Sequence, residues 1–143
     1  AQAGDALEWL RAQPADSALA ITALHLMEHL PFALRLALTQ ECARVLAPGG
    51  VLIYETPNPE NIWVGTHTFY HDPTHTQPLT PDSLVFLVNY CGLQAQPVLR
   101  LHPYPESANV PGDEPIVQRV NGMTCGGQDF AVIAHKPVAS LPN

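Results

Sequence analysis

Charged residues are scarce in this sequence, because Lys, Arg, Asp and Glu together make up only 13% of its 143 residues. Six residues are basic, and they are scattered along a chain whose formal net charge is -7. Without a basic patch, we do not expect the chain to bind the phosphates of DNA or RNA. No apolar run reaches the roughly 20 residues that a membrane helix needs. Nucleic-acid binding and membrane spanning are therefore not among the expected functions.

Cysteine is also scarce and is not arranged for metal binding. Cys42, Cys91 and Cys125 form an odd, widely spaced set without a CxxC pair. We therefore expect free or buried thiols in a reducing compartment, which makes the cytoplasm the predicted location.

Apolar spacing predicts an α/β domain. Helical spacing is found over 6–13 after the N-cap residue Asp5, over 31–46 with Pro31 in the first turn, and from Pro81 to about Tyr90. Strand patterns cover 18–24, 51–55, 97–102 and 129–136, whereas 56–81 and 103–127 read as loops. Trp63, Phe69 and Tyr70 favour an ordered first loop. The pattern predicts one domain over 1–137, with a mostly parallel sheet and an antiparallel last strand, and a tail over 138–143.

Three segments in order carry a resemblance to a known family. They are His25-Leu26-Met27-Glu28-His29-Leu30-Pro31 after the first strand, Pro48-Gly49-Gly50 before the second, and Glu55-Thr56-Pro57-Asn58 after it. This succession resembles the C-terminal half of class I S-adenosylmethionine-dependent methyltransferases, nearest to ubiquinone-type and O-antigen or polysaccharide biosynthesis enzymes.

The resemblance implies a partial Rossmann-like fold made of the family's strands four to seven, in the spatial order four-five-seven-six with the seventh strand antiparallel. The chain opens on Ala1 rather than on methionine, and the family's glycine-rich cofactor loop has no counterpart in it. We therefore expect a fragment that is inactive by itself.

The resemblance further implies S-adenosylmethionine as cofactor. Asp5 would accept a hydrogen bond from the adenine amino group, and the backbone N–H of Ala6 would contact the ring. Leu24 and His25 would line the cofactor where their strand ends. Two alternatives stay open: Asp5 as a plain helix N-cap and Leu24 as an ordinary core residue.

His25, Glu28 and His29 form an H-x-x-E-H pattern, whose spacing predicts one shared helical face. Two imidazoles so placed could bind a metal, as in the inverted zinc-peptidase motif. The preceding strand and Pro31 argue against such a helix, so we assign no metal. A general base or a structural hydrogen bond is the favoured role for His29.

The loop after the second strand holds the predicted acceptor site, which comprises Asn58, Asn61, Tyr70 and His71. We expect the acceptor to be a sugar or polysaccharide hydroxyl, or another small polar group, with His29 and His75 as catalytic bases. The alternative is a loop that is merely hydrogen-bonded. The regular spacing of His67, His71 and His75 is expected to be accidental, because Pro73 interrupts any helix.

Two further functions compete with methyl transfer. One is a noncatalytic binding or assembly module derived from the fold, favoured by the missing glycine-rich loop. The other is a metal-dependent hydrolase built on H-x-x-E-H. The apolar strand Ala18–Leu24 would lie at the edge of the sheet, so we expect a homodimer, or a bound partner segment, across that edge. His102 and His135 are expected to be solvated strand ends.

Overall fold

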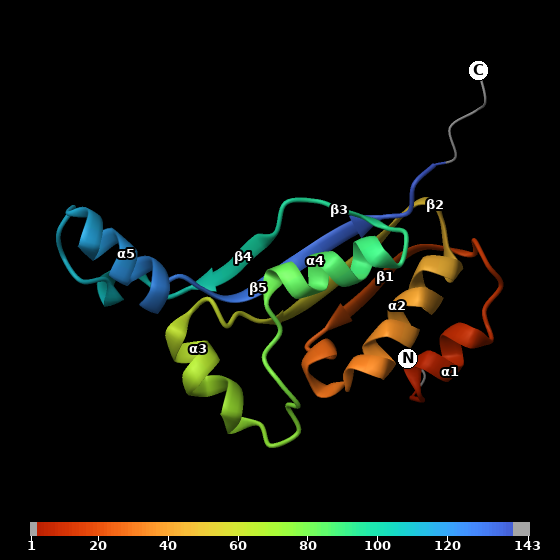
Figure 1. Ribbon diagram of the computed structural model, residues 1–143, viewed down its shortest axis with the longest axis horizontal. Helices are drawn as coiled ribbons and strands as arrows, with labels where there is room; N and C mark the ends of the chain where they lie inside the picture. Colours follow the sequence, from red (N-terminus) through yellow and green to blue (C-terminus); the bar gives the residue numbers. More distant parts are fainter. Residues whose placement is uncertain (1–2, 139–143) are drawn as a thin grey trace.

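The computed structural model describes residues 3–138, whose strands form one mixed sheet (Figure 1). Its strands are β1 (Ala18–Leu24), β2 (Leu46–Pro57), β3 (Gln94–Ala95), β4 (Leu99–Pro103) and β5 (Gly127–His135). The order is β1-β2-β5-β3, with β4 also paired to β5. β1 and β2 are parallel, and β5 runs antiparallel to all its neighbours. This is the spatial order four-five-seven-six expected from the resemblance, and the antiparallel last strand is confirmed.

Three helices agree with the sequence pattern: α1 (Ala6–Arg11), α2 (Phe32–Val45) and α4 (Pro81–Tyr90). Asp5 is the N-cap of α1, because its Oδ1 accepts a hydrogen bond from the Glu8 N–H at 2.9 Å. Pro31 occupies the N-cap position of α2 rather than its first turn. Contacts between α1 and α2 and between α2 and α4 join the three helices into one layer.

The buried core lies between this layer and one face of the sheet. Along β2, Leu52 and Tyr54 are fully buried, whereas Val51 and Ile53 are only half-buried. The Tyr54 hydroxyl lies 3.0 Å from Thr39 Oγ1 of α2, and it also approaches the Cys42 thiol. Burial raises the pKa of Cys42 to about 11, so this thiol is a neutral core group.

Two predicted boundaries were wrong near the strands. β2 begins at Leu46 rather than at residue 51, because Leu46 already pairs with Ala18. Pro48-Gly49-Gly50 therefore lies within the strand rather than before it. The strand predicted over 97–102 is two short strands, β3 and β4, which pair with different parts of β5. Pairing with a neighbour decides such limits, and the local sequence does not contain it.

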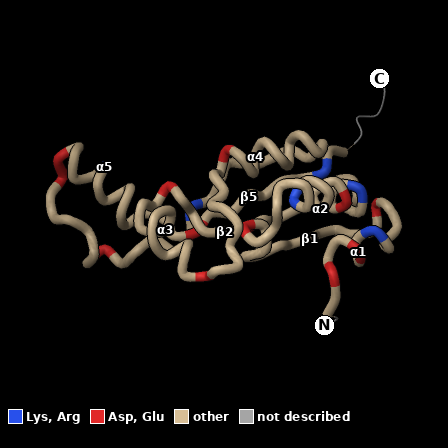
Figure 2. Tube along the Cα trace, turned by 60° about the horizontal axis from the view of Figure 1, so that its bottom comes forward, with Lys and Arg blue, Asp and Glu red and all other residues tan. Residues whose placement is uncertain are grey.

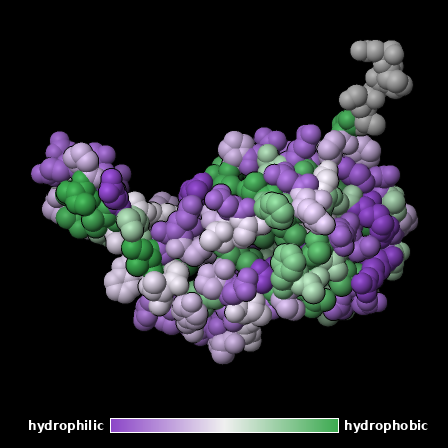
Figure 3. Space-filling model, viewed as in Figure 1, coloured by the Kyte–Doolittle hydropathy of each residue, from purple (hydrophilic) through white to green (hydrophobic). Residues whose placement is uncertain are grey.

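The loop predicted over 103–127 was also partly wrong. It contains a single turn, η3 (Glu106–Ala108), and the helix α5 (Pro115–Thr124), which begins at a proline suited to a first turn. None of the α5 side chains is buried. Ile116, Val120 and Met123 form an exposed apolar stripe on an arm that projects from the body (Figures 1 and 3). A helix that buries nothing leaves only a weak signal in the sequence.

The loop predicted over 56–81 is ordered by short helices, α3 (Ile62–Thr66) and η2 (Thr68–His71). Phe69 is buried and acts as the expected anchor, whereas Trp63 and Tyr70 are exposed. The segment therefore packs through Phe69 and Val64.

Charge is thinly spread over the surface, as Figure 2 shows for the two signs. Across residues 3–138, we find no helix with the length and apolar character required to traverse a bilayer. Most of the predicted tail, residues 139–143, lies outside the described residues.

Candidate functional site

The parallel strands β1 and β2 end at the same edge of the sheet, and the predicted catalytic residues gather there. After β1, a 3-10 turn, η1 (Met27–His29), carries Glu28 and His29. The loop after β2 folds back onto this turn, because the backbone N–H and the hydroxyl of Thr76 both donate to the carbonyl oxygen of Glu28 at 2.8 Å. The carboxyl edge of a parallel pair is where open α/β sheets place ligands.

His29 and His75 lie against each other, although they are 46 positions apart in the sequence. Their ring centroids are 4.7 Å apart, with the rings nearly edge to face. His75 also packs on the buried ring of Phe69 at 4.4 Å. The structure thus brings the two predicted bases together.

Hydrogen bonds decide which nitrogen of each ring carries a proton. Thr74 Oγ1 donates its hydrogen to Asp72 Oδ1 at 2.6 Å, so it accepts from His29 Nδ1 at 2.8 Å. The carbonyl oxygen of Phe69 can only accept, so His75 Nδ1 donates to it at 2.6 Å. In both neutral rings, Nε2 is therefore left as the basic nitrogen.

Asp72 ends this relay as a carboxylate. Hydrogen bonds from the hydroxyl and the backbone N–H of Thr74 lower the pKa of Asp72 below its ordinary value. An ionised Asp72 keeps the Thr74 hydroxyl turned toward itself, which in turn holds the Nδ1–H tautomer of His29.

The predicted acceptor residues fall into two groups. Asn58 and Asn61 are buried, and their amide groups donate to the carbonyl oxygens of Gly127 and Gly126 at 3.0 Å. Their side-chain oxygens accept from Glu60 and Trp63 backbone N–H groups. We infer from these bonds that both asparagines hold the loop against β5.

Tyr70 and His71 are exposed and remain available to a ligand. The His71 ring packs on His67, with centroids 4.7 Å apart, whereas His75 turns toward His29. The three regularly spaced histidines therefore do not form one group, and η2 ends at His71 before Pro73.

The H-x-x-E-H residues do not share the helical face that their spacing predicts, in line with the argument from the preceding strand and Pro31. η1 spans only Met27–His29, and His25 precedes it with a positive φ of 50°. His25 and Glu28 still meet, with Nδ1 and Oε1 3.3 Å apart, while His29 turns to Thr74. The structure therefore lacks the helix on which an inverted zinc-peptidase site depends.

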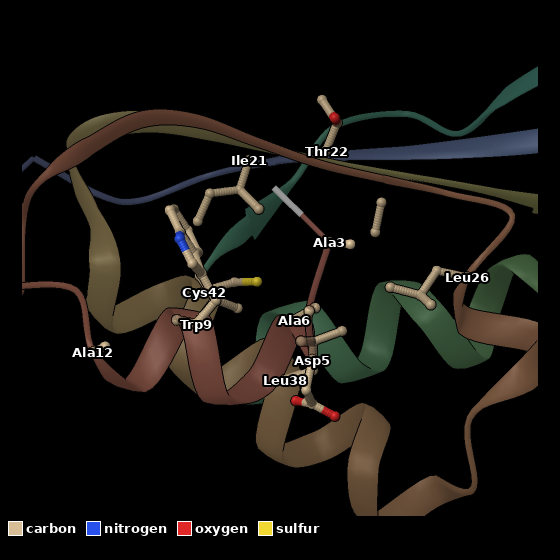
Figure 4. A pocket seen from close by; sticks show the side chains of 13 residues that line it. Ala3, Asp5, Ala6, Trp9, Ala12, Ile21, Thr22, Leu26, Leu38 and Cys42 are labelled. Atoms are coloured by element: carbon tan, nitrogen blue, oxygen red, sulfur yellow. The ribbon is translucent and has the colours of Figure 1, made fainter. Parts of the chain in front are cut away.

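A cavity of about 750 Å³ lies between α1, α2 and β1 (Figure 4). Asp5 and Ala6 line it from the α1 side, opposite Ile21 and Thr22 of β1. Leu24 and His25 are not among its lining residues. Most of its lining is apolar, and it lies along the edge where β1 has no strand partner among residues 3–138.

Sequence reasoning missed a second cluster at the carboxyl edge, formed by Glu55, Asp129 and His102 around His25. His102 Nδ1 lies 2.9 Å from Asp129 Oδ2, so His102 is not a merely solvated strand end. Glu55 could have been found as the acid that ends an apolar strand. Asp129 and His102 could not, because only the pairing of β4 with β5 brings them together.

Solved structures with a similar fold include methyltransferases and a cyclase. An S-adenosylmethionine-dependent methyltransferase from Archaeoglobus fulgidus has a TM-score of 0.86 and 24% identity, over 93% of this chain and 66% of that protein. An S-adenosylmethionine-dependent methyltransferase from Methanosarcina mazei has a TM-score of 0.57 and 17% identity, over 90% of this chain and 63% of that protein. The [4+2]-cyclase SpnF has a TM-score of 0.59 and 16% identity, over 96% of this chain and 56% of that protein.

The sequence itself matches no family model and no curated protein. Likeness at these identities establishes a shared fold, and one fold can serve several reactions. The chain spans 66% of the length of the Archaeoglobus protein. Its described part has the fold of the class I S-adenosylmethionine-dependent methyltransferases, as the resemblance of the sequence implied.

Proposed function

We propose that this chain is the C-terminal half of an S-adenosylmethionine-dependent methyltransferase domain. The observation that carries the proposal is the pair His29–His75 at the carboxyl edge of a sheet with the class I strand order. The exposed Tyr70 and His71 nearby suit a polar acceptor, which we propose to be a sugar or polysaccharide hydroxyl or another small polar group.

Asp5 and Ala6 suit the adenine end of the cofactor. A carboxylate offers only acceptors, which matches an exocyclic amine, and one oxygen of Asp5 is already held by the Glu8 N–H. The apolar lining of the neighbouring cavity suits the faces of an aromatic ring. When bound, the cofactor supplies an activated methyl group with a good leaving group.

The chain's own contribution is to place the acceptor and take its proton. Much of the acceleration in such a displacement comes from holding the reacting atoms close and in line. A hydroxyl acceptor also gains from a base, and His29 Nε2 is free for this role because Nδ1 donates to Thr74. We propose His29 as the base and His75 as the second candidate beside it.

Cofactor binding tests this proposal. We expect S-adenosylhomocysteine to bind measurably in calorimetry to a chain extended upstream by about 80 residues, enough for further βαβ units. The present chain alone should bind weakly or not at all and lack turnover, because its cavity is open along β1. Binding by neither chain would overturn the cofactor assignment.

Two substitutions in the extended chain locate the adenine. Asp5→Ser keeps an N-cap hydroxyl and removes the carboxylate, so the expected result is at least tenfold weaker binding without loss of α1. Glu8→Gln is the matched control, because it removes an exposed carboxylate from the same helix. Equal binding by Asp5→Ser and the parent chain would contradict the role given to Asp5.

The second candidate function is a noncatalytic assembly module, favoured by the free edge of β1. Leu19 and Leu24 are exposed there, with 80% and 56% of their surfaces accessible. A long apolar edge strand is a template for pairing with another chain, and we propose a homodimer across Ala18–Leu24.

Self-association tests the edge directly. We expect sedimentation of this chain to show a concentration-dependent dimer, and Leu19→Lys to raise its dissociation constant at least tenfold, since a charged lysine blocks edge pairing. Phe86→Lys on α4 is the control, because Phe86 is similarly exposed away from the edge. A monomer at all concentrations would refute the dimer.

A further inference from the structure

Three acidic side chains surround His25 where β1 and β2 end and β5 begins. His25 Nε2 lies 3.6 Å from Glu55 Oε1 and 3.9 Å from Asp129 Oδ1. On its other side, His25 Nδ1 lies 3.3 Å from Glu28 Oε1. The His25 ring is half-exposed, and the side chains of Glu55 and Asp129 are 20% and 18% exposed, so a small ion can reach them from solvent.

Glu28 is the unusual member, because it is fully buried and only one of its two carboxylate oxygens has a hydrogen-bond donor. Its Oε2 accepts a hydrogen bond from Thr56 Oγ1 at 2.9 Å. Its Oε1 has no hydrogen-bond partner within residues 3–138. A buried carboxylate oxygen without a donor is costly, and the nearest candidate donor is His25 Nδ1.

A turn of the His25 ring would let a proton on Nδ1 satisfy Glu28 Oε1, and that bond would fix the tautomer of the ring. The lone pair of Nε2 then faces the oxygens of Glu55 and Asp129. Three electron-rich atoms within 4.8 Å of one another repel one another unless a positive charge lies between them. The arrangement of a carboxylate behind a histidine is also the usual outer support of a metal-bound imidazole.

Asp129 is oriented in the same way. Its Oδ2 is held by His102 Nδ1 at 2.9 Å, which leaves Oδ1 directed at His25. His25 and His102 both have left-handed backbone, with φ of 50° and 54°. Such a backbone conformation is strained for a residue with a side chain, and strained residues cluster at functional sites.

We propose that His25 Nε2, Glu55 Oε1 and Asp129 Oδ1 bind a divalent cation, with Glu28 and His102 orienting the ligands. Bonds of about 2.0–2.2 Å would hold ligand atoms about 3.0–3.5 Å apart. The ligand atoms now lie within 4.8 Å of one another, so the side chains need to move together by roughly 1 Å or less around an ion. One imidazole with two carboxylates suits Mn²⁺ or Zn²⁺. The ligand set differs from the H-x-x-E-H residues, since His29 takes no part and Glu28 is an outer partner.

Metal titration of the chelator-treated chain tests the site. We expect one Mn²⁺ per chain by electron paramagnetic resonance, and one Zn²⁺ by calorimetry. Glu55→Gln and Asp129→Asn preserve side-chain shape and should each weaken binding at least tenfold. Glu28→Gln should weaken it about 10–100-fold through the orientation of His25.

Two controls keep the outcome specific. Glu106→Gln removes an exposed carboxylate that is not a member of the cluster and should leave the affinity unchanged. His75→Ala disrupts the other candidate group, Glu28, His29 and His75, and should also leave it unchanged. The proposal is overturned if neither ion binds below about 1 mM. It is equally overturned if His75→Ala abolishes binding while Glu55→Gln does not, since the cation would then lie at the other group.

Discussion

Replacing Phe130 with alanine is expected to lower the free energy of unfolding by about 3–5 kcal/mol. Phe130 is fully buried in β5, where it pairs with Thr56 of β2 and Arg100 of β4. β5 joins the two halves of the sheet, so a cavity at this point loses core contacts that the surrounding strands cannot recover by local relaxation.

Urea denaturation followed by circular dichroism measures the effect. Phe86→Ala is the matched control, because Phe86 is 68% exposed on α4 and its removal should change stability by less than about 0.5 kcal/mol. Similar losses for the two variants would mean that Phe130 does not occupy the core position described.

Replacing His29 with alanine is expected to slow methyl transfer by about 10²–10⁴-fold, the usual contribution of a positioned base. This expectation rests on the proposed function, so the assay uses the upstream-extended chain, radiolabelled S-adenosylmethionine and a panel of sugar acceptors. Thr74→Val should slow the reaction by about tenfold, since it removes one hydrogen bond that orients the base. In the double variant His29→Ala/Thr74→Val, the second substitution should lower the rate little further, because the Thr74 hydroxyl acts through His29.

The pH profile separates a base from a merely structural histidine. The pKa of Asp72 is lowered, so this carboxylate is ionised at neutral pH and stays ionised to lower pH than an ordinary aspartate. Its protonation therefore cannot cause a loss of rate near neutrality. If His29 is the base, the limb of the pH profile that reports its protonation should disappear in His29→Ala. His67→Ala is the control for exposed loop histidines. An unchanged rate in His29→Ala would exclude His29 as the base and direct the same experiment to His75.

Neighbouring residues were enough to predict most of the α-helices, and the family resemblance implied the order of the strands. Asp5 and Thr80 cap α1 and α4, as a short polar side chain before a helical apolar pattern indicates. The continuous apolar residues of Ala18–Leu24 indicated a strand of a parallel sheet, and the ordered motifs placed it beside β2. Capping and apolar period are local signals, since they depend on residues a few positions apart.

The site required contacts between residues far apart in the sequence. His29 and His75 were both predicted as bases, but their edge-to-face packing and the Thr74–Asp72 relay follow from the return of the loop onto η1. The failure of H-x-x-E-H as a helical motif has a local origin instead, because the end of β1 and Pro31 leave room for only one turn.

By itself, then, the sequence determined the α/β class, and the resemblance of its motifs implied the strand order and the candidate site. Only the tertiary structure decided that His25 faces Glu28, Glu55 and Asp129, and that His102 holds the last of these. The physical reason is that these side chains come from separate elements, and the pairing of β5 with β2 and β4 is what brings them together.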